Sequence, residues 1–177
     1  MEQRTVVSGK ELIKIAKTTS PIGIKGDVKI VPLFFNVEEL NGLFSLCKNE
    51  IYLVRGSEFP KRVSLSSSRE SKDHLSMTFE GIETRTQATD LSKLDVYVPY
   101  PIYSKYVQDT NNVFGYIGYM VEDRKLGAVG KVTDVLRQVQ TLLVVDDKLV
   151  PFVKEFVESI DYNNKLIKTN LPEGLLE

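Results

Sequence analysis

Residues 26–31 read Gly-Asp-Val-Lys-Ile-Val, and residues 74–80 read His-Leu-Ser-Met-Thr-Phe-Glu. In both stretches polar and apolar side chains alternate, which is the period of two expected of a strand with one buried face. The same alternation, or a short apolar run, recurs at residues 51–54, 62–66 and 95–98. These stretches predict a mostly β structure for the first half of the chain.

Two short segments of the first half are predicted to be helices instead. Residues 36–46 begin with an asparagine, which caps helix N-termini well, and continue with two glutamates, whose charge suits the helix dipole. Residues 84–94 begin with a threonine and place small or apolar side chains at helical spacing.

The composition changes at residue 99. Pro99-Tyr100-Pro101 favours extended backbone, because a residue that precedes proline avoids helical angles. Residues 99–112 show no convincing period of either kind. We interpret residues 99–112 as a stiff linker between a domain at residues 1–98 and a second domain at residues 113–177.

A second set of strands is predicted within residues 113–177. Apolar runs at 116–121 and 128–132 are followed by two hairpins, whose turns are Asp146-Asp147 and Asn163-Asn164. Five or six short strands with little helix indicate a small barrel. The sequence therefore predicts two small β-barrels in one chain.

The composition excludes several classes of protein. The chain has 23 basic and 24 acidic residues, so long-range attraction does not draw it to nucleic acid, and any RNA contact is expected to be local. The single cysteine, Cys47, excludes an intramolecular disulfide. The N-terminal residues lack the apolar core of a signal peptide, and no apolar run approaches the ~20 residues of a membrane helix. We expect a cytoplasmic protein.

Residues that could carry catalysis are few. His74 is the only histidine, and nothing in the sequence pairs it with Cys47 as a nucleophile or completes a zinc site around the two. Neighbouring carboxylates such as Asp146 and Asp147 point to opposite faces of a strand or into solvent at a turn. No phosphate loop or dinucleotide fingerprint is present. We expect no enzymatic activity, cofactor or metal; an enzyme using Asp134, Asp146 or His74 is the alternative.

Residues 22–26 read Ile-Gly-Ile-Lys-Gly, with the glycine spacing of the backbone-clamping loop in KH RNA-binding domains. That loop joins two helices and has an apolar residue where this chain has Lys29. We therefore favour a turn that leads into a strand, with Gly23 and Gly26 at positive φ.

Three motifs resemble the ribosome maturation factor RimM family, in the order in which the family has them. Residues 21–30 contain a proline, one residue, the pattern G-x-x-G and then a strand. Residues 79–91 are similar to the family segment F-x-G-I-x-x-R-x-x-A-x-x-L. Residues 149–176 resemble the end of a PRC barrel. The resemblance covers almost the whole chain. It implies a mostly β fold: an N-terminal translation-factor-like six-stranded β-barrel and a C-terminal PRC-type β-barrel.

The resemblance also implies a function. The family assists assembly of the head of the 30S small subunit and processing of 16S rRNA. The implied partners are ribosomal protein nineteen of the small subunit, the immature 30S subunit and nearby 16S rRNA, and we expect the chain to act as a monomer. The alternative is a PRC-barrel scaffold for another complex, which the N-terminal barrel with its G-x-x-G loop disfavours.

Two sets of residues are expected to make these contacts. Family members carry a Tyr-Tyr pair just before the PRC barrel, where this chain has two asparagines, so nearby aromatic side chains would have to serve as anchors. Core packing or docking of the linker is the alternative role for these aromatic residues, and Phe114 and Tyr116 are the ones expected in the core. The expected partner-binding residues are Tyr103, Tyr106, Asn111, Asn112, Phe114 and Tyr116. The expected RNA-facing loop contains Gly23, Lys25, Gly26 and Lys29.

Overall fold

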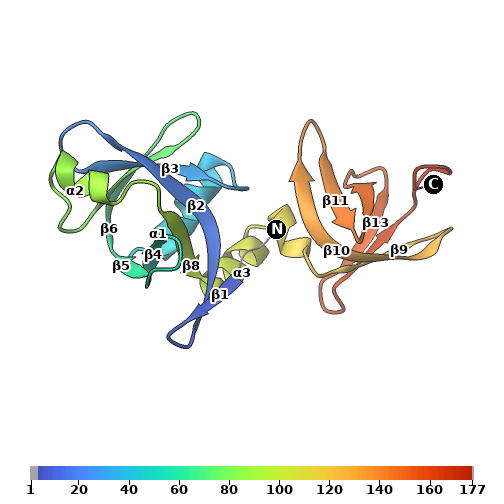
Figure 1. Cartoon of the computed structure of the whole chain (residues 1–177). Helices are drawn as coiled ribbons and strands as arrows, with labels where there is room; N and C mark the ends of the chain where they lie inside the picture. The colour runs from blue at the N-terminus through green and yellow to red at the C-terminus, as the bar shows by residue number, and fades with distance from the viewer. Residues whose placement is uncertain (1–3, 177) are drawn as a thin grey trace. The chain divides into compact units, whose positions relative to one another are not determined.

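The computed structural model describes residues 4–176, and its strands form two separate sheets (Figure 1). Backbone contacts divide the chain into two compact units, with the division between Tyr106 and Val107. Figure 1 colours the strands of the first unit blue to green and those of the second orange to red. The predicted mostly β fold class, with one sheet for each half of the chain, is confirmed.

Within the described part of the N-terminal unit, eight antiparallel strands run in the order β5-β4-β8-β2-β3-β7-β6, with β1 paired to β2. The strands are β1 (Arg4–Val7), β2 (Lys10–Ile22), β3 (Asp27–Pro32), β4 (Ile51–Val54), β5 (Lys61–Val63), β6 (Leu65–Glu70), β7 (Leu75–Phe79) and β8 (Asp95–Pro99). Six strands were expected. The count is higher because β1 forms a hairpin with β2, and because the chain changes partners at Ser64, so that β5 pairs with β4 but β6 pairs with β7.

Both predicted helices of the first half are present. Helix α1 (Val37–Leu46) begins with a capping box made by Asn36 and Glu39, and it buries Leu40, Leu43 and Phe44. A capping box made by Thr84 and Gln87 begins helix α2 (Arg85–Asp90).

Helix α2 is shorter than the predicted 84–94. It ends at Asp90 because Leu94 is bonded to strand β2 instead of to the helix: the N–H of Leu94 donates to Thr18 Oγ1 at 2.8 Å, and the Thr18 N–H donates to the Leu94 carbonyl at 2.9 Å.

The extended linker predicted at residues 99–112 is wrong in its conformation. Helix α3 (Tyr100–Asp109) occupies most of it. Pro101 is the second residue of this helix, and proline is tolerated in a first turn because its missing N–H would have no partner there. The effect of a proline on the residue before it therefore did not exclude a helix. The division between the two units falls within α3.

The described part of the C-terminal unit begins with a short 3₁₀ helix, η1 (Val113–Tyr116), and continues as a six-stranded sheet in the order β12-β11-β10-β9-β14-β13. The strands are β9 (Met120–Asp123), β10 (Gly127–Arg137), β11 (Thr141–Val145), β12 (Lys148–Pro151), β13 (Val157–Asp161) and β14 (Leu166–Thr169). Strand β14 runs parallel to β9, and the other pairs are antiparallel. Both predicted hairpin turns are confirmed, between β11 and β12 and between β13 and β14.

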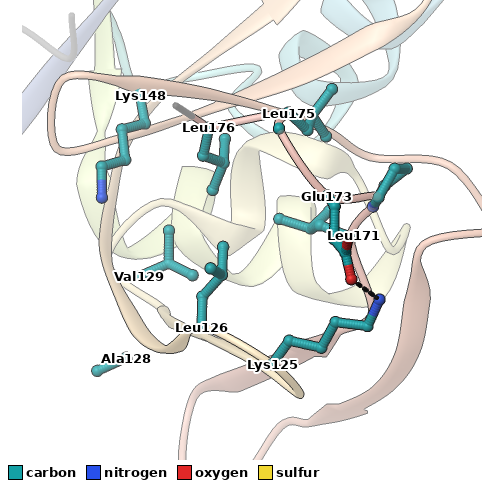
Figure 2. Close-up of a pocket in the computed structure, with 11 residues that line it drawn as sticks. Lys125, Leu126, Ala128, Val129, Lys148, Leu171, Glu173, Leu175 and Leu176 are labelled. Atoms are coloured by element: carbon teal, nitrogen blue, oxygen red, sulfur yellow. Dashed lines mark hydrogen bonds and ion pairs between the residues drawn. The ribbon is translucent and has the colours of Figure 1, made fainter.

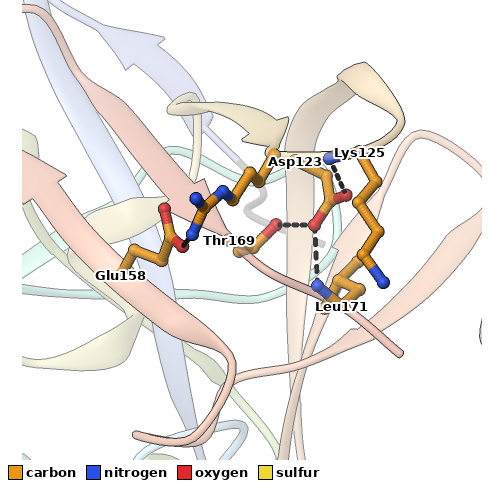
Figure 3. Close-up of polar contacts among 6 residues, drawn as sticks. Asp123, Lys125, Glu158, Thr169 and Leu171 are labelled. Atoms are coloured by element: carbon orange, nitrogen blue, oxygen red, sulfur yellow. Dashed lines mark hydrogen bonds and ion pairs between the residues drawn. The ribbon is translucent and has the colours of Figure 1, made fainter. Parts of the chain in front are cut away.

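A buried carboxylate ties the end of the C-terminal sheet together (Figure 3). Asp123 Oδ1 accepts hydrogen bonds from the N–H groups of Lys125 and Leu126, at 2.9 and 3.1 Å. Its Oδ2 accepts from Thr169 Oγ1 at 3.1 Å and from the Leu171 N–H at 2.8 Å. Burial alone would raise the pKa of Asp123, but these hydrogen bonds together hold it below its ordinary value of 3.8.

The substitution Asp123→Asn is expected to destabilise the C-terminal unit by at least about 2 kcal/mol, because an amide NH₂ would face N–H donors that need an acceptor. Since the folded-state pKa of Asp123 is lowered, its ionisation stabilises the fold above pH 3.8, and this contribution disappears as the pH falls through the folded-state value. Near neutral pH, the β9 and β14 amides should therefore be better protected from hydrogen exchange in the unmodified chain than in Asp123→Asn. This difference should become smaller in acid.

The matched control is Glu122→Gln, at the exposed neighbouring position on β9. It should leave protection unchanged. Equal protection in Asp123→Asn and the unmodified chain near neutral pH would contradict a stabilising role for the Asp123 carboxylate.

Candidate functional site

The G-x-x-G segment is a turn between two paired strands. Ile22 and Asp27 are opposite each other in the β2–β3 hairpin, and the turn lies between them. Gly23 has φ +61° and Gly26 has φ +85°, which glycine adopts without strain. The predicted glycine-bounded turn is confirmed, and the helical surroundings of a KH loop are absent from this part of the structure.

The turn is packed against the second motif of the sequence. A Cβ atom on Gly26 would clash with the carbonyl oxygen of Ile82 and lie 2.8 Å from its carbonyl carbon, so only glycine fits. Arg85, the first residue of α2, donates from Nη1 to the Gly23 carbonyl at 2.7 Å. The two N-terminal motifs, far apart in sequence, thus form one structural cluster.

The side chains that this turn presents to solvent are few. Ile24 is 78% exposed at the tip, and Lys25 beside it is exposed. Lys29 Nζ lies 4.0 Å from Asp73 Oδ2, so its charge is partly neutralised. Of the expected RNA-facing residues, the two glycines shape the turn, and Lys25 is the one that offers an exposed cation.

A pocket of about 200 Å³ lies within the C-terminal unit, between the segment around η1 and the β13–β14 turn. Three tyrosines line it, together with two residues from the expected partner-binding set that are not aromatic. The tyrosines are Tyr116, Tyr119 and Tyr162, and the other two are Asn111 and Asn112. The structure therefore brings part of the expected set together around one cavity.

The tyrosines of the pocket form an aromatic cluster. The Tyr116 ring lies 5.4 Å from that of Tyr119 and 5.1 Å from that of Phe152, measured between centroids. Burial, and then a hydrogen bond with Tyr162, raises the pKa of Tyr116 well above its ordinary value, and burial raises that of Tyr119. The hydroxyl groups of Tyr116 and Tyr119 are therefore neutral at physiological pH. Tyr162 is 56% exposed and gives the cluster its accessible ring.

The two asparagines at the family's Tyr-Tyr positions have different roles. Asn112 is buried and caps η1, because its Oδ1 accepts from the Phe114 N–H at 3.1 Å and from Arg137 Nη2 at 3.4 Å. Asn111 is exposed at φ +49°, a left-handed conformation that asparagine tolerates better than most residues. Asn112 is thus a structural residue, and Asn111 is left at the rim of the pocket.

The remaining aromatic residues of the expected set pack inside the units. Phe114 is buried, with the Arg137 guanidinium 4.9 Å above its ring centroid. Tyr103 is buried against the ring of Phe35 in the N-terminal unit, at a centroid distance of 5.9 Å. The Tyr106 hydroxyl donates to the Glu39 carbonyl at 2.9 Å.

For these three aromatic residues the structure supports the packing alternative. Tyr119 and Tyr162 also line the pocket but are not in the expected set. The sequence signal for Tyr162 is its place directly before the Asn163-Asn164 turn, where an aromatic residue is not needed for the core.

The tail of the third motif forms an apolar groove of about 340 Å³ with the β9–β10 hairpin (Figure 2). Leu171, held by Asp123, is buried at its base, and Leu126 and Val129 face it from the hairpin. An ion pair of 3.3 Å between Lys125 and Glu173 spans the groove. The apolar residues near the end of the sequence therefore complete the C-terminal unit.

The titratable residues considered for catalysis lie in different units: His74 is in the N-terminal unit, and Asp134 and Asp146 are in the C-terminal unit. His74 Nδ1 lies 2.7 Å from Asp73 Oδ1 near the surface of the N-terminal unit, and Asp146 is exposed in a turn. Burial, with a smaller effect of Glu50, raises the pKa of the Cys47 thiol to about 12. Among residues 4–176, no three His, Cys, Asp or Glu side chains are grouped to hold a metal ion. No helix in that range is long and apolar enough to cross a membrane.

Comparison with known proteins identifies the family. The family model for the RimM N-terminal domain matches residues 13–101, and that for the RimM PRC barrel domain matches residues 113–175. The chain belongs to the RimM family. The resemblance to the family that the three motifs indicated is thereby confirmed, and the two matches fall on the two sheets.

Relatives align with this RimM-family chain over nearly its full length. A protein of Prochlorococcus marinus subsp. pastoris is 28% identical over 183 aligned residues, which cover 97% of this chain and 99% of the relative. One of Bacteroides thetaiotaomicron is 29% identical over 181 residues, covering 97% and 96%. Both are named ribosome maturation factor RimM. A solved RimM structure from Pseudomonas aeruginosa, 22% identical, covers 91% of this chain and 98% of its own with a TM-score of 0.47.

The two glycines of the turn provide a matched test of the N-terminal cluster. Gly23→Ala should cost about 1–2 kcal/mol, because the only penalty is the left-handed backbone and no atom lies within 4 Å of the new Cβ. Gly26→Ala should cost clearly more, because it adds a clash with the Ile82 backbone to a similar strain. Urea denaturation of both variants measures the difference, and equal costs would contradict the close packing.

Proposed function

We propose that this chain is a non-enzymatic maturation factor of the small ribosomal subunit, which assists assembly of the 30S head and processing of 16S rRNA in the cytoplasm. The observation that carries the proposal is the match of both family domains, in order, over residues 13–101 and 113–175. Relatives named as ribosome maturation factors, similar over almost the whole chain, support it.

The partner proposed for the C-terminal unit is ribosomal protein nineteen of the small subunit, bound at the tyrosine-lined pocket. Buried aromatic anchors supply much of the affinity at protein interfaces, and a tyrosine offers both an apolar ring and a hydroxyl group. Tyr162 is the exposed ring of the cluster, with Tyr116 and Tyr119 behind it. In this chain the pocket would make the contact with the ribosomal protein that the Tyr-Tyr pair makes in other family members. Asn111 lies at the rim of the pocket.

The N-terminal unit is proposed to lie against rRNA through the tip of the Gly23–Gly26 turn. The turn is held from behind by Arg85 and Ile82, so its backbone is fixed before it meets a partner. Lys25 supplies a local positive charge, which suits a chain whose overall charge is −1.

The mechanism proposed is differential affinity. A protein that binds the immature conformation of its partner more tightly than the mature one shifts the population while assembly proceeds, and it dissociates when folding is complete. A preference of 1.4 kcal/mol corresponds to a tenfold ratio of affinities.

The tagged chain is expected to recover immature small subunits from a lysate, and Tyr162→Ala should weaken that binding by about 30-fold, as loss of an aromatic anchor costs about 2 kcal/mol or more. Because Tyr162 is 56% exposed, the variant should keep its fold. Tyr162→Phe retains the ring and should bind more tightly than Tyr162→Ala. Titration with purified immature subunits measures the affinities.

The control is Leu149→Ala, at a half-exposed apolar position of the same unit that does not line the pocket. It should bind as the unmodified chain does. Recovery of no immature subunits by the unmodified chain, together with normal rRNA processing in a deletion strain, would reject the proposed function; equal binding by Tyr162→Ala would reject the pocket as its interface.

A further inference from the structure

The loop between β4 and β5 presents an aromatic ring to solvent. A turn brings the Glu58 N–H to the Arg55 carbonyl at 3.0 Å, with Gly56 at φ +55°. Phe59 follows this turn and is 91% exposed. Pro60 restricts Phe59 to extended backbone, so the ring is presented from a conformationally limited position.

The cations that flank this ring are not neutralised by carboxylates. Arg55 donates from Nη2 to the carbonyls of Asp90 and Ser92, at 3.1 and 3.4 Å. Arg62 donates from Nε to the Asn49 carbonyl at 2.6 Å. Such contacts orient a guanidinium and leave its charge uncompensated.

Lys61 is exposed, and none of the ion pairs found among the described residues includes it. Two lysines of strand β2 differ, since Lys10 and Lys14 form ion pairs of 2.8 and 2.9 Å with Glu50 and Asp95. The segment from residue 55 to residue 62 thus carries three cations against one acidic residue, Glu58.

A hollow of about 360 Å³ lies beside the ring, between this loop and the β1–β2 hairpin. Apolar surface from Val6, Pro60 and Phe59 lines it, and Val6 is itself 70% exposed. Polar residues, including Glu58, complete the lining of the hollow. An exposed aromatic ring at its rim, in a segment that carries three cations, offers a flat group a face on which to stack.

We propose that residues 55–62 bind unpaired nucleotides of an RNA strand, with a base stacked on Phe59 and a phosphate beside Arg62, which by strand register shares the face of Tyr97 in the hollow. Aromatic rings combined with a basic surface are how proteins bind single strands without reading their sequence, because every base has a π-face. This site is distinct from the Gly23–Gly26 turn, and it rests on the proposed function only for the source of the RNA.

The test is binding of the full chain to a short labelled oligouridylate, followed by fluorescence anisotropy. Phe59→Ala should weaken binding by about 5- to 150-fold, the range measured for loss of base stacking on one ring. Phe59→Trp should retain binding, and Phe59→Leu should lose it although an apolar side chain remains. Because Phe59 is almost fully exposed, these variants should fold as the unmodified chain does.

The charge is tested by the variant Arg62→Ala. Loss of one phosphate contact to a single strand should reduce the slope of log affinity against log salt concentration by about 0.7. The control Lys72→Ala removes an exposed cation from the β6–β7 turn and should leave the slope unchanged.

Equal affinity of the unmodified chain and Phe59→Ala overturns the proposal, as does full binding by Phe59→Leu, which would indicate a general apolar contact such as that of a protein partner. Binding to vesicles of anionic lipid in place of the oligonucleotide also overturns it. If the chain recovers immature subunits but does not bind the oligonucleotide, this inference fails and the proposed function stands. If it binds the oligonucleotide through Phe59 but recovers no subunits, the proposed function fails instead.

Discussion

Each sheet bends around its own apolar core, and this constraint determines where the molecule can act. Leu12, Ile30 and Phe79 are almost fully buried in the N-terminal unit, as are Leu143 and Ile167 in the C-terminal unit. Small barrels are filled by such side chains. The aromatic side chains that could contact a partner are those exposed in loops, such as Tyr162 and Phe59.

The motifs by which the sequence resembles its family lie where loops are held in place. In the N-terminal unit, Gly26 and Arg85 join the G-x-x-G turn to the segment that begins α2. In the C-terminal unit, Asp123 joins the β9–β10 turn to the tail that begins at Leu171. Of the exposed aromatic residues, Phe59 lies outside the motifs, and Tyr162 lies within the third one, in the turn between β13 and β14.

Much of the fold could be predicted because strands and caps leave local signals. Alternation of polar and apolar residues located most of the strands but not β1 or β2, and asparagine and threonine caps located α1 and α2. Helix α3 was missed because a proline in a first turn has the same sequence signal as a proline in an extended linker. The change of partner at Ser64 is a long-range event without a local signal. The expected partner-binding set stays a prediction; which of its aromatic side chains are buried could not be predicted, since burial depends on residues distant in sequence.

Hydrogen–deuterium exchange of the full chain, with and without purified immature small subunits, measures most directly which amides a partner covers. Binding through loop surfaces predicts slower exchange in the bound state at residues 23–26, 111–119 and 162–165, with the core amides of β2 and β10 unchanged. Unchanged exchange in all three segments, under conditions where the subunits demonstrably carry the protein, would contradict the assignment of function to these surfaces.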